Sequence, residues 1–123
     1  MEKRVKNIFK QNITIKVNGS LWLESADQHF FGPGPVELLE RIAETGSISE
    51  AAKAMKMSYK KAWELVNTLN TQTVNPVVIP RTGGEKGGGS TITDEAMELI
   101  KYHRRLRERF AAFLAAETER IKK

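Results

Sequence analysis

The stretch 46–70 constrains the fold more than any other part of the chain, because it combines two helical patterns with a very short break between them. In the first pattern, Ser49 is a plausible N-cap, and Ala51, Ala52 and Met55 give a small inner face that can pack closely. In the second, Ser58 is the expected N-cap, and the apolar positions recur at helical spacing: Ala62, Leu65, Val66 and Leu69. The stretch predicts a helix-turn-helix over 48–70.

The far side of the second helix is polar, short-chained and partly basic. At about 100° per residue, that side carries Lys60, Glu64, Asn67 and Thr71, flanked by Lys61 and Thr68. Its first turns can reach the edges of bases while its free amide end faces phosphate. The pattern favours a recognition helix for double-stranded DNA, and a globular helical hairpin with a polar outer face is the alternative.

Composition agrees with a DNA-binding protein without requiring one. The 123 residues are enough for one domain, and the net charge of +5 favours polyanionic partners. The segment 46–92 holds six basic and three acidic residues, so its net charge is +3, the most positive of the chain. The absence of cysteine excludes disulfides, thiol catalysis and zinc-finger ligation.

Neither catalytic chemistry nor a membrane is expected. The sequence lacks a nucleophile–base pair and a metal-ligand cluster, and Glu37, Glu40 and Glu44 are most simply a solvated helix face. We therefore expect no enzyme activity, no catalytic residue, no metal and no cofactor. No run approaches the ~18 apolar residues of a membrane span, and the N-terminus lacks an apolar signal core. A cytoplasmic location without a membrane partner is the expectation.

The N-terminal third predicts a flexible basic arm over 1–10 and then a β-hairpin. Ile13, Ile15 and Val17 alternate with polar residues. A loop at 18–20 would pair Val17 with Leu21 and Ile15 with Leu23, which gathers the aliphatic side chains on one face. A two-residue Asn-Gly turn would mix them with polar residues, so the longer loop is preferred. Trp22 would then point towards solvent or a partner subunit.

Residues 27–34 are expected to connect this hairpin to a supporting helix. Proline at the helix start and glycine at its end suit the stretch from Pro35 to Gly46. Its apolar stripe consists of Val36, Leu38, Leu39, Ile42 and Ala43.

A second hairpin is expected at 77–93, directly after the recognition helix. The segment 76–81 predicts a strand that its two prolines confine to a sheet edge, and 90–93 predicts the returning strand. The loop 82–89 between them has five glycines among eight residues, and bare amides together with Arg81 and Lys86 suit contact with phosphate. Such a hairpin is the wing of a winged helix; a flexible tip without function is the alternative. A nucleotide phosphate loop is disfavoured. Such a loop requires a lysine followed by serine or threonine at the start of a helix, and the loop 82–89 does not have this sequence.

The last segment, 94–123, predicts a long helix that starts after an N-cap at Thr93 and extends to about residue 120. Apolar residues recur at alternating steps of three and four: Ala96, Leu99, His103, Leu106, Phe110 and Phe113. Met97, Ile100 and Leu114 form a second stripe. A helix that is apolar on two sides predicts packing on the body and on a second subunit. His103 is expected to pack in this seam; a metal or pH-switch role is the alternative.

Several motifs together resemble the DNA-binding domain of ModE, the molybdate-responsive transcriptional regulator, which is similar to the LysR-type winged helix-turn-helix. They are Phe-Gly-Pro-Gly at 31–34, Ala-Glu-Thr-Gly-Ser-Ile at 43–48, Ser-Tyr-Lys-Lys-Ala-Trp at 58–63 and the glycine-rich loop 82–89. The resemblance covers about residues 12–113. It implies a winged-helix homodimer that binds a palindromic operator, with the long helix in the dimer interface. ModE regulators also carry a C-terminal molybdate-binding region. This sequence ends at Lys123, so we expect no molybdate-binding region and do not carry molybdate sensing over.

The sequence thus predicts a mainly α fold with small β-hairpins: a flexible N-terminus (1–10), a winged helix-turn-helix (11–93) and a long dimerisation helix (94–123). Three residues are candidates for contact with base edges: Lys60, Glu64 and Asn67. Six are candidates for contact with phosphate: Ser58, Tyr59, Lys61, Arg81, Lys86 and Gly87. Five are candidates for the dimer interface: Leu99, His103, Leu106, Phe110 and Phe113.

Two questions stay open at this point. Trp63 flanks the inner face of its helix, so packing is favoured over DNA contact, whereas for Tyr59 neither is favoured. The main rival function is a protein-interaction module, or an adaptor for a separately encoded effector-binding protein.

Overall fold

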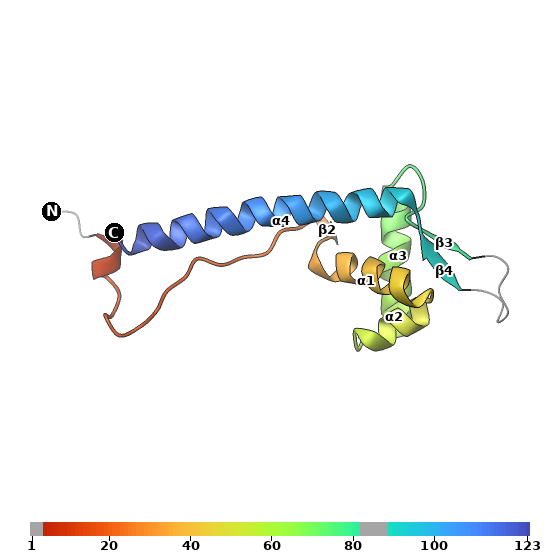
Figure 1. Cartoon of the computed structure of the whole chain (residues 1–123), viewed down its shortest axis with the longest axis horizontal. Helices are drawn as coiled ribbons and strands as arrows, with labels where there is room; N and C mark the ends of the chain where they lie inside the picture. Colours follow the sequence, from red (N-terminus) through yellow and green to blue (C-terminus); the bar gives the residue numbers. More distant parts are fainter. Residues whose placement is uncertain (1–3, 82–88) are drawn as a thin grey trace.

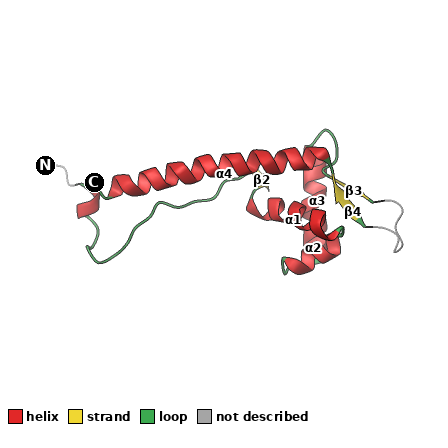
Figure 2. Ribbon diagram, viewed as in Figure 1, coloured by secondary structure: helices red, strands yellow, loops and turns green. Residues whose placement is uncertain are grey.

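A computed structural model describes residues 4–81 and 89–123. This part of the chain is mainly helical and has two small antiparallel hairpins, an arrangement compatible with a winged helix (Figures 1 and 2). The elements in chain order are a 3-10 turn (Val5–Asn7), β1 (Leu23–Ser25), β2 (Gln28–Phe31), α1 (Pro33–Thr45), α2 (Ile48–Ala54), α3 (Tyr59–Gln72), β3 (Val78–Pro80), β4 (Ser90–Ile92) and α4 (Asp94–Ile121).

Helix α4 sets the shape of the molecule. At 1.5 Å per residue, its 28 residues span about 42 Å. The other helices and both hairpins gather around its N-terminal half, and its C-terminal half projects beyond them (Figure 1). The segment before β1 runs back beside this projecting half, so that the 3-10 turn lies near the end of α4. None of the described helices is both long and apolar enough to cross a membrane.

The hydrophobic core is centred on α1. Leu38, Leu39 and Ile42 of this helix are fully buried, and they share one cluster with Leu69 of α3 and Phe31 of β2. The cluster continues into the second hairpin and α4 through residues that include Val77, Val78, Ala96 and Ile100. Burying each large aliphatic side chain contributes about 1.5–3 kcal/mol. The body is therefore held together through α1, against which the other elements pack.

Helix ends follow local capping chemistry. The Ser58 hydroxyl accepts a hydrogen bond from Lys61 N at 3.0 Å, and the Thr93 hydroxyl accepts one from Ala96 N at 3.3 Å, so both predicted N-caps are confirmed. α1 ends at Gly46 with φ of 73°, as predicted. The expected cap at Ser49 is wrong: Ser47 caps α2 by accepting from Glu50 N at 3.1 Å. Both serines are good caps, and the early stop at Gly46 makes the first of them the cap.

The expected N-terminal hairpin is wrong in position. The strands are β1 and β2, which pair antiparallel, and the turn between them uses Ala26 and Asp27, both with positive φ. Two such residues in succession are the mark of a type I′ turn. The sequence around them lacks the glycine that usually signals this turn, whereas the Asn-Gly at 18–19 carries the signal and lies outside both strands.

Packing against the body explains where the hairpin forms. The Trp22 ring covers Gly32, where a Cβ atom would lie 2.5 Å from the indole, and it stacks on the His29 ring at a centroid distance of 4.9 Å. Trp22 is therefore half-buried against its own chain rather than turned away. Residues 27–34 are likewise not a plain connection, because 28–31 form β2 and Phe31 is in the core. The helix that follows begins at Pro33, two residues before the expected start.

The C-terminal helix packs differently from the expected seam. Ala96, Ile100 and His103 are the buried residues of α4, so both predicted stripes contribute to the contact with the body. The His103 ring is 2% exposed and meets Phe31 edge-on at a centroid distance of 5.6 Å. Burial lowers the pKa of this imidazole below its ordinary value, and Arg107 lowers it further. His103 is thus covered by its own chain, and its place in a dimer interface stays a prediction. Leu99 and Leu106 are half-buried, and Phe113 is 54% exposed.

Candidate nucleic-acid interface

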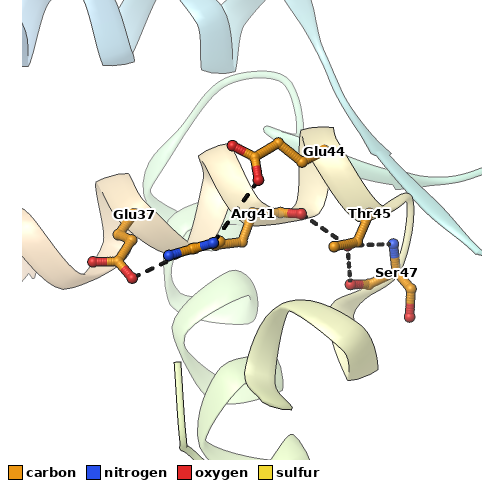
Figure 3. A network of polar contacts seen from close by, with 5 residues as sticks. All are labelled: Glu37, Arg41, Glu44, Thr45 and Ser47. Atoms are coloured by element: carbon orange, nitrogen blue, oxygen red, sulfur yellow. Dashed lines mark hydrogen bonds and ion pairs between the residues drawn. The ribbon is translucent and has the colours of Figure 1, made fainter. Parts of the chain in front are cut away.

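The interface is built on the turn between α1 and α2, which sets the direction of the helix pair. The Thr45 hydroxyl lies 2.8 Å from Arg41 O and 3.0 Å from Ser47 O, and it accepts a hydrogen bond from Ser47 N at 3.2 Å (Figure 3). Arg41 also reaches Glu37 at 3.6 Å and Glu44 at 3.9 Å along the same helix. Ion pairs this exposed contribute little to stability. The backbone contacts of Thr45 and the caps are what fix the turn.

The turn between α2 and α3 is equally tight. Lys56 takes a positive φ of 56°, and Met57 N donates to Ala52 O at 3.0 Å. The buried Ala51, Ala52 and Ala62 have side chains small enough for the two helices to approach closely. Together these features hold α3 against α2 with its opposite side facing outwards.

The outer face of α3 is solvent-exposed along its length. Lys60, Glu64 and Asn67 are exposed, and so are the neighbouring Lys61, Thr68 and Thr71, as the periodicity predicts. Within residues 4–81 and 89–123, neither lysine of this face lies in an ion pair. Two ammonium groups beside the positive end of the α3 dipole make this surface attractive to anions. The geometry of this face allows contact with a polyanion. Which of its residues contact base edges and which contact phosphate stays a prediction.

Two aromatic side chains extend this surface. Tyr59 is 56% exposed and Trp63 is 49% exposed. The preference for a packed Trp63 is therefore not supported, since about half of the residue's surface is exposed, on the same helix as Lys60 and Asn67. An exposed indole of this kind is available to a partner molecule.

The second hairpin is joined to the helix pair at Gly46. β3 and β4 pair antiparallel, with Val78 opposite Ile92 and Pro80 opposite Ser90. Ser90 N donates to Gly46 O at 2.9 Å, and Arg81 N donates to Gly89 O at 3.0 Å. The Arg81 guanidinium lies over Gly46, because a Cβ added there would be 2.8 Å from Nη1. Arg81 is exposed and is held near the turn before α2. Lys86 and Gly87 lie outside the described residues.

Substituting Gly46 tests this joint. Gly46→Ala is expected to lower the free energy of unfolding by about 1–2 kcal/mol, because φ is positive and alanine disfavours this region. It should also displace Arg81. Urea denaturation measures the change, and Gly34→Ala is the matched control, since no atom lies within 4 Å of an added Cβ there. Alanine at position 34, inside α1, should instead be neutral or stabilising. Equal effects of the two substitutions would contradict the role of Gly46.

Asn70 is a residue of the interface scaffold that sequence reasoning missed. Its Oδ1 accepts from Val77 N at 2.8 Å and from Val78 N at 3.4 Å, and its Nδ2 donates to Val78 O at 3.2 Å. One side chain thus ties the end of α3 to the start of β3. The only signal in the sequence is a polar residue next to Leu69, an apolar position of the inner face. That signal does not by itself predict hydrogen bonds from the side chain to a distant backbone.

Comparison with known proteins identifies relatives over most of the chain. No protein-family model matches the sequence. The molybdenum transport protein ModE of Azotobacter vinelandii is 36% identical over 86 residues, which cover 70% of this chain and 32% of that protein. The transcriptional regulator ModE of Haemophilus influenzae is 35% identical over 91 residues, covering 74% and 32%. The DNA-binding transcriptional dual regulator ModE of Escherichia coli is 37% identical over 83 residues, covering 68% and 32%.

The match therefore spans about a third of the length of these relatives. The names of the Haemophilus and Escherichia relatives describe transcriptional regulators. This chain is related to the ModE-type transcriptional regulators, and the relationship covers the N-terminal part of those proteins.

Proposed function

We propose that this chain is a sequence-specific, winged-helix DNA-binding regulator that acts as a homodimer on a palindromic operator. The observation that carries the proposal is the outer face of α3, which is exposed, polar and basic at its start, with β3 and β4 joined beside it. An α-helix of this kind fits the major groove of B-DNA, and a neighbouring hairpin can follow the adjacent backbone. The names of the relatives support DNA as the partner.

Within this proposal, the position of a residue on α3 decides whether it contacts base edges or phosphate. Lys60, Glu64 and Asn67 lie on the middle of the outer face, where side chains meet base edges in the groove. Ser58, Tyr59 and Lys61 surround the amide end of the helix, which faces phosphate. Arg81 extends the phosphate contacts from the joint with the second hairpin, and Lys86 and Gly87 of the glycine-rich loop are proposed to continue them.

The proposed dimer rests on α4. Leu99, Leu106 and Phe113 recur every seven residues and are half-buried or exposed in the single chain. A repeat of seven is the spacing at which two helices meet along one seam. Two recognition helices related by a two-fold axis would read two half-sites about one DNA turn apart, which explains a palindromic operator.

A gel-shift titration against the DNA upstream of the chain's own gene, across a salt series, tests the function. We expect one retarded complex whose affinity exceeds that for random DNA by about 10³ or more. The logarithm of the binding constant should fall linearly with the logarithm of the salt concentration, by about 0.9 for each phosphate neutralised. Equal affinity for upstream and random DNA at every salt concentration would favour a protein-interaction module instead.

Two alanine substitutions on the same face separate base contact from phosphate contact. Asn67→Ala is expected to reduce the preference for operator over random DNA about 5- to 150-fold, because a bidentate contact between amide and base contributes ~1–3 kcal/mol. Lys61→Ala should weaken binding to all sequences and reduce the salt slope by about one unit. Both residues are exposed, so unfolding curves should match those of the unsubstituted protein. If the two variants lose the same property, the division of α3 into two contact zones is wrong.

A further inference from the structure

Residues 12–22 have the alternating pattern of a strand but lie in no strand of the described chain. Ile13, Ile15 and Val17 share one side with Gly19 and Leu21, while the even-numbered positions are mostly polar. In residues 12–20, the described contacts include one backbone hydrogen bond, from Val17 N to Thr118 Oγ1 at 2.8 Å. A segment of this kind leaves a row of unpaired N–H and C=O groups, which natural proteins normally pair or cover.

The segment lies loosely along the projecting half of α4 (Figure 1). Lys16, Val17 and Asn18 line an open groove of about 340 Å³ together with α4 residues that include Leu114 and Thr118. Ile13 is 49% exposed. Ile15 and Val17 are half-buried, so the apolar side of the segment is only partly covered within one chain.

The strand that continues this segment also has a free edge. β1 follows directly at Leu23 and pairs with β2 alone in the described chain. The irregularity in the ladder falls on β2, since Leu23 pairs with Phe31 and Glu24 with His29, which leaves Phe30 as the extra residue. β1 itself contains no extra residue. A two-stranded sheet is only marginally stable by itself, so a third strand on this edge would be stabilising.

We infer that a second copy of this chain supplies that third strand, so that residues 13–18 of each chain pair antiparallel with residues 20–25 of its partner. This inference rests on the proposed homodimer. A two-fold axis at Gly19 places residue 13 opposite residue 25 of the partner, 15 opposite 23 and 17 opposite 21. These are the pairs of a hairpin folded within one chain, with all the apolar side chains on one face. Exchange of an identical element between two copies makes the same contacts between chains, at little additional cost.

The position of Gly19 on α4 supports this axis. A Cβ at Gly19 would lie 3.3 Å from Cζ of Phe110, so the absence of a side chain leaves space for that ring. The same axis therefore passes near Phe110, whose ring stacks on Phe113 at a centroid distance of 6.4 Å. It brings two α4 helices together in antiparallel orientation around these phenylalanines. The exchanged strands would form a layer over that helix pair, continuous with the α4 seam of the proposed dimer.

Disulfide trapping tests the exchange, because the chain contains no cysteine. Positions 14 and 24 are opposite each other in the exchanged pair. Their Cα atoms are expected to be ~4.5–5.5 Å apart, as in any antiparallel pair. Both side chains are exposed. Ten residues of extended chain hold them about 33 Å apart within one copy. The variants Thr14→Cys and Glu24→Cys are prepared separately, mixed under reducing conditions, unfolded and refolded together, and then oxidised. The expected product is a covalent heterodimer in roughly half of the chains on a non-reducing gel.

Each single variant oxidised alone, and the mixture of Thr14→Cys with Ser25→Cys, are the matched controls. Position 25 faces the opposite side of the strand, so these samples should yield little covalent dimer. The double variant Thr14→Cys/Glu24→Cys should crosslink between chains; a fast-migrating monomer with an internal disulfide would overturn the exchange in favour of a closed hairpin. Light scattering of the reduced proteins measures whether they are dimers, so it tests the proposed homodimer separately from the strand exchange. A dimer that forms no heterodimeric crosslink would leave the proposed homodimer standing and refute the strand exchange.

Discussion

Phe113→Asp is expected to convert the dimer to a monomer and to abolish high-affinity operator binding. Phe113 is 54% exposed in the single chain, on the projecting half of α4 where the body gives no cover. Burying one phenylalanine contributes about 1.5–3 kcal/mol, and a symmetric interface contains the residue twice. The loss is therefore at least about 3 kcal/mol, which weakens the dimerisation constant about 100-fold or more. A buried carboxylate on each side adds a desolvation penalty.

Light scattering at micromolar protein concentration and a gel shift with the operator measure the two consequences. Lys101→Gln is the matched control: it makes the same change of one unit in charge on an exposed position of α4, away from the seven-residue repeat. It should leave the dimer intact. If the unsubstituted protein is already monomeric at high concentration, the homodimer and the palindromic operator are both wrong. Operator binding that is unchanged in monomeric Phe113→Asp would refute the palindromic operator alone.

The second large effect is expected at Asn70. Asn70→Ala removes the partners of Val77 N and Val78 O, and these two valines are 0% and 5% exposed. Leaving a buried backbone group without a partner costs about 1–3 kcal/mol, so the variant should lose at least about 2 kcal/mol of folding free energy. For a domain of this size, that loss corresponds to a fall in Tm of roughly 10 °C. The second hairpin would also lose its attachment to α3.

Asn67→Ala is the matched control for this substitution. It makes the same change one turn earlier on the same helix, at a position where the side chain is exposed. The two variants are expected to be opposite in their effects: Asn70→Ala lowers stability, and Asn67→Ala lowers sequence preference at unchanged stability. Urea denaturation followed by circular dichroism, at equal protein concentration, makes the comparison. Identical unfolding midpoints would show that Asn70 does not anchor the hairpin.

Local chemistry made much of the helical framework predictable. The caps at Ser58 and Thr93 and the stop at Gly46 depend on groups within a few residues of each other, so the sequence contains the whole cause. The inner and outer faces of α3 follow from helical periodicity for the same reason: Ala62 and Leu69 are buried, and Lys60, Glu64 and Asn67 are exposed. The residues proposed to contact DNA belong to this local class, apart from Arg81, which lies over Gly46, and those of the glycine-rich loop.

Contacts between distant segments decided the rest. The alternation of apolar and polar residues predicts that residues 13–17 pair with 21–23, but it does not distinguish pairing within one chain from pairing between two. Here Trp22 packs on Gly32 and His29, so the hairpin within the chain forms from residue 23 onwards. The repeat along α4 does not distinguish a body from a partner either: His103 is covered by Phe31, while Phe113 lies beyond the end of the body. Asn70 acts through Val77 and Val78, whose proximity exists only once α3 and β3 have met. Periodicity says that a side chain will be buried, and tertiary structure decides what buries it.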